Sequence, residues 1–399
     1  MNLRCLLVIL AGCSFQLDVG GLAGEDAPDG DGVIDEDAPA DASMLASACA
    51  QLALGSEHTC VLRRSDQNVY CWGLNGYQEL GGSSATTRVN LPPSVDLSSR
   101  AYTTCAVGND GLVRCWGYND HGQIGDGTVG GTRPPTVVSG MTGAVQVAAG
   151  RSHTCARRAN GTLRCWGSNA AGQLGDGTFT SKPSATTDVN GLTGMERVTT
   201  GGSHTCAHGP TSGWCWGDNE HGQLGDGTLI AKSSPLAMPV TNVQRTGPAS
   251  FSALAVVGAH TCSIVGAGEV WCWGDNAYGQ LGNGTTTDSL TPVRATGLTD
   301  AVELAMGRWT VCALRGTGQV SCWGRNYYGE AGVGTTQVQS TPGDIGLVNV
   351  AALGAGGFHS CALNAMNELY CWGDNSSAQL GDGTTTQRTA PVRSNTICP

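Results

Sequence analysis

The chain has 399 residues, of which 13% are charged and 6% are aromatic, and its formal net charge at pH 7 is −11. An acidic chain without a basic patch cannot neutralise a phosphate backbone, so composition argues against a nucleic-acid-binding protein. Eighteen cysteines at this density are typical of a protein that folds in an oxidising compartment.

The N-terminus predicts export. A short basic start, Met1–Arg4, precedes an apolar run of 8 residues that is too short to span a bilayer. The run ends Leu-Ala-Gly-Cys at Cys13, which resembles a bacterial lipoprotein signal. We therefore expect residues 1–12 to be a signal peptide and Cys13 to be lipidated, with an ordinary signal peptide as the alternative. Ser14, in place of aspartate, favours the outer membrane or cell surface by that resemblance; a periplasmic or secreted location is the alternative.

An acidic segment follows the signal. Residues 14–48 contain nine acidic and no basic residues, which leaves 23 acidic against 20 basic residues in residues 49–399. Low hydrophobicity with high charge predicts a disordered tether over 13–48. An Asp-Gly-Asp-Gly run at 29–32 resembles part of a calcium loop, but Ala27 and Ala38 occupy the first and last ligand positions, so calcium binding is the less favoured reading.

A repeat fills the remainder of the chain. The triplet Cys-Trp-Gly occurs seven times, with steps of 44, 50, 50, 57, 50 and 49 residues between its cysteines. These cysteines are Cys71, Cys115, Cys165, Cys215, Cys272, Cys322 and Cys371. A period near 50 indicates an array of one supersecondary unit that buries its apolar face only against its neighbours.

Each unit reads as short strands. The clearest one predicts strands at 145–150, 152–157 and 162–166, a tight turn at Asn160-Gly161, and a compact glycine-rich loop at 167–178. A short fourth strand with a proline, as in Thr291–Arg294, suits a sheet edge. Seven such units and no helical periodicity predict an all-β, seven-bladed β-propeller over residues 49–399, since a β-solenoid normally has shorter repeats.

Paired cysteines predict one disulfide in each blade. A three-residue loop at 159–161 pairs Arg158 with Thr162 and places Cys155 opposite Cys165, within disulfide range. Separations of 9 and 11 residues in two other repeats require another loop length or a bulge. The predicted pairs are Cys60–Cys71, Cys105–Cys115, Cys155–Cys165, Cys206–Cys215, Cys262–Cys272, Cys312–Cys322 and Cys361–Cys371.

Two further cysteines are predicted to close the ring. Superposing the repeats brings Cys49 and Cys398 to positions two residues apart in a regular unit. A Cys49–Cys398 bridge would clasp the two ends of the propeller, and two unrelated free thiols are the alternative.

Zinc is the rival explanation of the cysteines. A histidine precedes several of them by two residues, as at His58 and His153, but Thr103 and Thr310 replace it in two repeats. Only three candidate ligands recur, whereas structural zinc is normally four-coordinate. We therefore predict no metal, and we expect these histidines to hydrogen-bond to backbone within each blade.

The repeat resembles the regulator of chromosome condensation repeat family. The matching residues of one unit are Gly150, His153, Trp166, Gly167, Asn169, Gly172, Gln173, Leu174 and Gly175. The resemblance implies a seven-bladed propeller. It leaves function open, because the family includes a nuclear exchange factor for a small GTPase, chromatin binders and secreted inhibitors of β-lactamases. Exchange activity is disfavoured here by the export signal, the paired cysteines and the lack of a basic arm. Departures at Gln78-Glu79, Glu330-Ala331 and Ala378 predict reshaped or partner-facing loops.

No motif indicates catalysis. The chain contains neither a phosphate-cradling glycine-lysine loop nor a nucleophile elbow. Recurring acidic or amide residues lie in Gly-Asp-Gly-Thr-like turns, which such side chains cap. These residues are Asp126, Asp176, Asp226, Asn283 and Asp382. We expect neither an enzyme nor a cofactor.

One variable position suggests a binding rim. The second residue after the asparagine of each glycine-rich loop is Tyr77, His121, Ala171, His221, Tyr278, Tyr328 or Ser377. Propeller symmetry places all seven on one rim, and tyrosine is favoured at binding sites. Trp309 and Tyr327 are additional candidates, and a long connection around Leu229–Ser252 could extend a rim loop. In the secreted inhibitors, aromatic loop residues of one face grip the partner; here the alternative is that the aromatics pack the loops.

The sequence thus predicts an exported, lipid-anchored, monomeric and non-enzymatic propeller that binds a protein partner through one loop face. A lectin-like binder of cell-surface glycans is the first alternative. A propeller hydrolase is the second, and it predicts a cluster of unpaired acids in the central channel.

Overall fold

The computed structural model describes residues 50–82, 86–210, 212–238 and 251–395. The predicted signal peptide, Cys13, the acidic tether, the Cys49–Cys398 clasp and most of the long connection after Leu229 lie outside the described residues.

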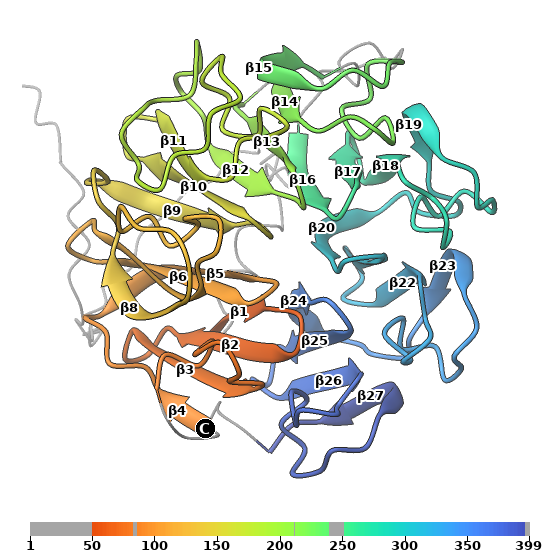
Figure 1. Cartoon of the computed structure of the whole chain (residues 1–399). Helices are drawn as coiled ribbons and strands as arrows, with labels where there is room; N and C mark the ends of the chain where they lie inside the picture. The colour runs from red at the N-terminus through yellow and green to blue at the C-terminus, as the bar shows by residue number, and fades with distance from the viewer. Residues whose placement is uncertain (1–49, 83–85, 211, 239–250, 396–399) are drawn as a thin grey trace, which may run out of the picture. The chain divides into compact units, whose positions relative to one another are not determined.

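Seven antiparallel sheets form a ring, with the first strand of each sheet around the centre (Figure 1). The first three sheets are β1 (Ala50–Leu54), β2 (His58–Arg63), β3 (Asn68–Gly73) and β4 (Thr86–Arg88); β5 (Ser94–Arg100), β6 (Thr103–Gly108), β7 (Val113–Tyr118) and β8 (Thr132–Val137); and β9 (Ala144–Ala149), β10 (His153–Arg158) and β11 (Leu163–Gly167).

The other four sheets are β12 (Arg197–Thr200), β13 (His204–His208), β14 (Gly213–Gly217) and β15 (Lys232–Ala237); β16 (Phe251–Val257), β17 (His260–Val265), β18 (Glu269–Gly274) and β19 (Ser289–Arg294); β20 (Ala301–Met306), β21 (Thr310–Arg315), β22 (Val320–Gly324) and β23 (Gln339–Asp344); and β24 (Val350–Ala355), β25 (His359–Asn364), β26 (Leu369–Gly373) and β27 (Arg388–Arg393). The predicted seven-bladed propeller is therefore confirmed, and blades are numbered 1 to 7 in this order.

The outer edges of the blades follow the proline pattern. Prolines lie in the fourth strands β8, β15, β19, β23 and β27, each of which pairs only with the third strand of its own sheet. A missing N–H costs nothing on the unpaired side of an edge strand. In blade 3 the outer strand is reduced to two isolated bridges, Arg164–Asp188 and Gly167–Lys182.

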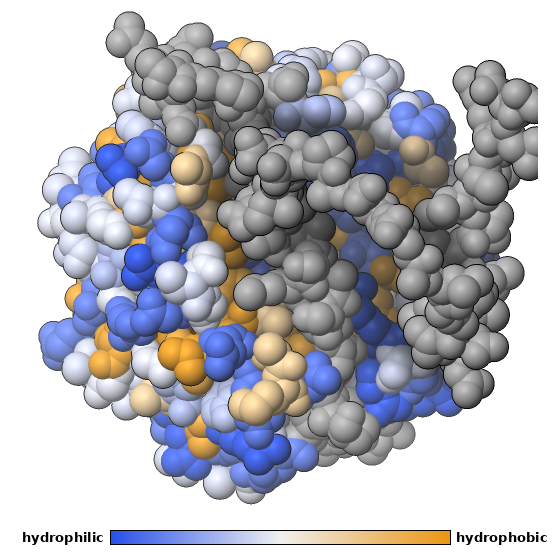
Figure 2. All heavy atoms as spheres, turned by 180° about the vertical axis from the view of Figure 1, so that it is seen from behind, coloured by the Kyte–Doolittle hydropathy of each residue, from blue (hydrophilic) through white to orange (hydrophobic). Residues whose placement is uncertain are grey.

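Apolar surface is dispersed on the face shown in Figure 2. There, the apolar residues of the described part lie in several small groups among hydrophilic ones (Figure 2). None of the elements in the described ranges is a helix long and apolar enough to cross a membrane.

All seven predicted disulfides are present, one in each blade. Cys155 lies opposite Cys165 with their Cα atoms 4.0 Å apart, and the Arg158 N–H donates to the Thr162 carbonyl at 2.9 Å as the loop length requires. The pairs separated by 9 and 11 residues are also directly opposed, because only their hairpin loops differ in length. Since these sulfurs are bonded to each other, they are not thiolate ligands, and the zinc alternative is rejected.

The Cys-Trp-Gly tryptophans join neighbouring blades. Each is at most 2% exposed, and each indole Nε1–H donates to a backbone carbonyl of the preceding blade. Trp166 donates to the Gln123 carbonyl at 2.9 Å. The same bond forms from Trp72, Trp116, Trp216, Trp273, Trp323 and Trp372, at 2.7 to 3.0 Å. Trp72 reaches Gln379 of blade 7, so this contact also closes the ring.

The buried histidines form a second connection between blades. His153 Nε2 lies 2.8 Å from the Thr205 hydroxyl of the next blade, and His359 Nε2 lies 2.8 Å from Thr59 across the ring closure. His58 and His204 make the equivalent contacts. The expectation that these histidines hydrogen-bond to backbone within their own blade is wrong. Each of these four Nε2 atoms lies instead within hydrogen-bond distance of a threonine hydroxyl in the neighbouring blade.

We predict that Trp166→Phe lowers the free energy of unfolding by about 2–3 kcal/mol, from the lost hydrogen bond and the cavity left by the smaller ring. Urea unfolding with disulfides intact measures this change. Trp271→Phe is the matched control, because Trp271 is only partly buried and lies outside the inter-blade set. Equal effects of the two substitutions would contradict the inter-blade role.

Stability is predicted to fall in mild acid. Burial lowers the pKa of His58, His153, His204 and His260 to about 3, whereas the unfolded chain titrates near 6.5. Between these values the unfolded state binds protons that the native state does not, so unfolding becomes easier as pH falls. Each histidine contributes a slope of about 1.4 kcal/mol per pH unit.

The measurement is the free energy of urea unfolding between pH 5 and pH 6.5, compared between two proteins so that the raised pKa of the buried Glu303, about 7, affects both equally. His153→Gln should reduce the slope of the unfolding free energy against pH by about 1.4 kcal/mol per pH unit, because the unfolded variant binds one proton fewer. A slope that is unchanged by this substitution would show that His153 is protonated in the native state.

Candidate binding face

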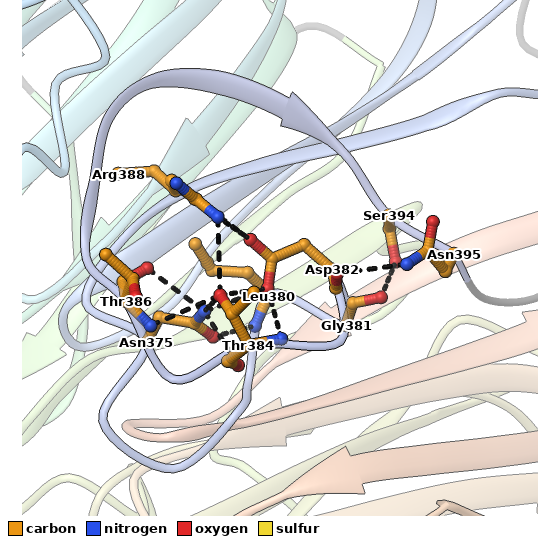
Figure 3. A network of polar contacts seen from close by, with 9 residues as sticks. All are labelled: Asn375, Leu380, Gly381, Asp382, Thr384, Thr386, Arg388, Ser394 and Asn395. Carbon is orange, nitrogen blue, oxygen red and sulfur yellow. Dashed lines mark hydrogen bonds and ion pairs between the residues drawn. The ribbon is translucent and has the colours of Figure 1, made fainter.

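The glycine-rich loops are held by one asparagine each, as Figure 3 shows for blade 7. Asn375 Oδ1 accepts the Leu380 N–H at 3.0 Å, and its Nδ2 donates to the Thr384 and Thr386 carbonyls. In the same loop, Asp382 Oδ1 accepts the Thr384 N–H at 2.9 Å. Equivalent bonds form at Asp126, Asp176, Asp226 and Asn283. The predicted turn-capping role of these five residues is confirmed.

The backbone of each rim residue is fixed by the side chain two positions later. The His121 N–H donates to Gln123 Oε1 at 2.9 Å. The same bond holds Ala171, His221, Tyr278 and Ser377. A rim side chain therefore projects from a backbone that is already ordered, which reduces the entropy lost when a partner binds.

The departures from the loop pattern do not reshape the loops. The Tyr77 N–H donates to Glu79 Oε2 at 2.8 Å, as it would to glutamine, and Glu330 accepts from Tyr328 in the same way. Burial raises the pKa of both carboxyls. Gln78 and Ala378 adopt the positive φ of the glycine that they replace, at 66° and 59°. The prediction of altered loop backbones is wrong, because each substitute keeps the required bond or dihedral angle.

Four of the predicted rim residues meet in one arginine–aromatic cluster of blades 5 to 7. It comprises Tyr278, Trp309, Tyr327, Tyr328, Phe358, Arg308 and Arg325. Trp309 lies edge-on to Tyr278, with ring centroids 5.6 Å apart. The Arg325 guanidinium lies 4.8 to 5.2 Å from four ring centroids, and Arg308 lies 4.0 Å from that of Trp309. Cations at such distances are attracted to the ring faces.

Two other predicted residues belong to a tyrosine cluster of blades 1 and 2. Tyr77 contacts Tyr102 and Tyr118, with centroids 5.0 and 5.2 Å apart, and Tyr118 contacts His121 at 6.4 Å.

His221 lies in neither cluster. Its Nδ1 is 3.0 Å from Asp288 Oδ2, and this hydrogen bond raises the pKa of His221, as do the charges of Asp275 and Asp218. His221, Asp275 and Asp288 offer ligand atoms within 4.8 Å of one another, so they are a set that could hold a metal ion. Two of the three side chains are exposed, and an ion pair accounts for their contact without a metal.

Five members of the two clusters were not predicted from the sequence: Tyr102, Tyr118, Arg308, Arg325 and Phe358. Their positions in the repeat could have identified them. Tyr102, Trp309 and Phe358 occupy the same repeat position, directly before the histidine or threonine of the second strand. Tyr118 and Arg325 share the position directly after Cys-Trp-Gly, and Arg308 lies next to Trp309. Aromatic residues and arginines at these two repeat positions form clusters because the side chains of neighbouring blades meet there.

Three acidic residues line a cavity of about 560 Å³ in the central channel. They are Asp96, Glu196 and Glu303, and Arg197 lies among them. Asp96 accepts hydrogen bonds from Gln51 Nε2 and the Val147 N–H, at 2.9 and 2.8 Å. Burial raises the pKa of Glu303 to about 7, and its Oε2 has no hydrogen bond within the described part of the chain. Among the buried side-chain atoms of the described residues that line this cavity, Glu303 Oε2 is thus the one carboxylate oxygen without a hydrogen bond.

Two family models of the regulator of chromosome condensation (RCC1) repeat match this chain. One matches residues 49–79, 96–123, 144–173, 251–280, 301–330 and 350–379. The other matches 110–157, 160–208 and 267–314.

Curated proteins of different kinds are similar to parts of this chain. The ultraviolet-B receptor UVR8 of Arabidopsis thaliana is 29% identical over 318 residues, which are 73% of this chain and 70% of the receptor. The E3 ubiquitin-protein ligase HERC2 of Homo sapiens is 36% identical over 114 residues, which are 26% of this chain but only 2% of the ligase.

Solved structures share the fold. Human WBSCR16 superposes with a TM-score of 0.68 and 23% identity, covering 79% of this chain and 86% of that one. Prp20p from Saccharomyces cerevisiae gives 0.65 and 21%, covering 77% and 80%.

Proposed function

Because this chain belongs to the regulator of chromosome condensation (RCC1) repeat family, we propose that it binds a protein partner through its rim and catalyses no reaction. Propellers of this repeat are protein-interaction scaffolds; the Prp20p structure, for example, was described together with binding of that protein to Gsp1p and histones. At 21% identity those partners are not transferred to this chain.

The arginine–aromatic cluster is the observation that carries the proposal. Tyrosine, tryptophan and arginine are the residues that contribute most to protein–protein affinity. Here they come from blades 5 and 6, and Tyr327 and Tyr328 remain 53% and 39% exposed. Packing within the loops therefore accounts for only part of their surface. A partner would cover the remaining ring surface, while Arg325 is already only 8% exposed, so its cation–π contacts are largely desolvated before binding.

We further propose that the propeller is exported and tethered to a membrane through lipid on Cys13. Seven disulfides fit an extracellular or otherwise oxidising location. The lipoprotein-like start and the acidic segment up to residue 48 support a flexible connection between lipid and propeller.

Removing two rim tyrosines should abolish partner binding. We predict that Tyr278→Ala with Tyr328→Ala weakens binding at least about a hundredfold, since each lost anchor costs about 2 kcal/mol or more. Affinity capture from the native cell envelope with the tagged full-length protein, followed by titration of the captured partner, measures this effect.

Phe179→Ala is the control, because Phe179 is also exposed, at 57%, and comes from blade 3. It should leave capture unchanged, and all variants should unfold at the temperature of the natural chain. Capture that persists in the tyrosine double variant would reject the rim as the binding face.

Lipid attachment is tested separately. We predict that Cys13→Ser moves the protein from the membrane fraction to the soluble exported fraction and abolishes incorporation of labelled palmitate, because stable anchoring requires the acyl chains. Unchanged fractionation and labelling would contradict the tether.

A further inference from the structure

A second surface lies on the propeller axis, where the turns between the first and second strands of all seven blades meet. One residue of each turn lines a single cavity of about 380 Å³, which we call the axial pocket. These turn residues are Ser56, Ala101, Arg151, Gly202, Gly258, Arg308 and Gly357. Five of them are small and leave space, whereas two are arginines.

Three arginines line the axial pocket. Arg100, Arg151 and Arg308 come from blades 2, 3 and 6, and none of the three forms an ion pair with any residue that the structure describes. Arg100 donates from one terminal nitrogen to the Met306 carbonyl at 3.2 Å, while its buried Nε has no hydrogen-bond partner. The pKa of Arg308 is lowered, first by burial and then by the charges of Arg151 and Arg325. A group of guanidinium ions that repel one another and lack a counter-ion favours an anionic ligand.

Three carboxylates line the same pocket. Asp218, Glu220 and Asp275 come, with His221, from the loops of blades 4 and 5, which stand in the ring between Arg151 of blade 3 and Arg308 of blade 6. No ion pair joins these three carboxylates to a basic side chain in the described ranges. They would repel a simple anion, just as the arginines would repel a simple cation. Both signs thus line one pocket without pairing with each other, so a ligand that carries both is the complementary one.

We propose that the axial pocket binds a zwitterion of the amino acid or short peptide class. The ligand's carboxylate contacts the guanidinium groups of Arg151 and Arg308, and its ammonium group contacts the carboxylates of Asp218 and Asp275. Tyr102 and Trp309 flank the pocket and contact the apolar part of the ligand. A volume of about 380 Å³ is within the range of small-molecule sites.

The axial pocket shares Arg308 and Trp309 with the arginine–aromatic cluster, but Tyr278 and Tyr328 do not line it. The double variant that tests the rim should therefore retain zwitterion binding, so the two proposals fail separately.

The test is isothermal titration of the full-length protein with triglycine, N-acetyl-triglycine and triglycine amide, which differ only in terminal charge. We expect triglycine to bind at least about tenfold more tightly than either single-charge analogue, because each charged end makes charge-assisted hydrogen bonds. Glycine in a parallel titration distinguishes a free amino acid from a peptide. Equal affinities for the three peptides, or no triglycine binding at millimolar concentration, would overturn the proposal.

Two charge-deletion variants assign the ends of the ligand. Arg151→Ala with Arg308→Ala should make triglycine bind as weakly as triglycine amide. Asp218→Asn with Asp275→Asn should make it bind as weakly as N-acetyl-triglycine. Arg64→Ala is the control, since Arg64 lines the other cavity of the channel and should have no effect. Unchanged affinity in the arginine variant, with native thermal unfolding, would also overturn the proposal.

Discussion

The hydrogen bond from each Cys-Trp-Gly indole to a carbonyl of the preceding blade is the contact on which the rest of the structure depends. A single sheet of this repeat has no second layer of its own to cover its face. The buried tryptophan supplies that cover, and its N–H needs an acceptor because an unpaired buried donor is costly. The Gln123 carbonyl meets this need for Trp166 and also accepts the Thr154 hydroxyl at 2.9 Å. Seven such contacts make the ring.

The same glutamine connects the blade interface to the rim. Its backbone carbonyl accepts the tryptophan of the next blade, while its side chain holds the N–H of His121 in its own loop. Blade packing and rim geometry are thus set by one residue, and each rim side chain can change without disturbing the scaffold. This explains how tyrosine, histidine, alanine and serine occupy equivalent positions on nearly identical loops. The proposed partner-binding surface consists of these variable positions.

Contacts within one repeat could be predicted from the sequence, whereas contacts between two repeats could not. The strands, the hairpin loop at 159–161 and the disulfide Cys155–Cys165 follow from spacing within a unit, and the structure confirms them. The role of His153 does not, because its partner Thr205 belongs to the next unit. Glu79 was misjudged because a carboxylate accepts the same N–H as the amide it replaces. The aromatic clusters and the axial pocket combine residues of several blades. Predicting them requires knowing which repeat positions neighbouring blades bring together, and the spacing within one repeat does not show this.

Exchange of the indole protons tests the inter-blade contact most directly. The chain has ten tryptophans, of which seven make this bond, while Trp214, Trp271 and Trp309 do not. Nitrogen-15 NMR of tryptophan-labelled protein transferred to heavy water should show seven slowly exchanging indole N–H signals and three fast ones. Rapid exchange of the Cys-Trp-Gly indoles in the folded protein would contradict the account.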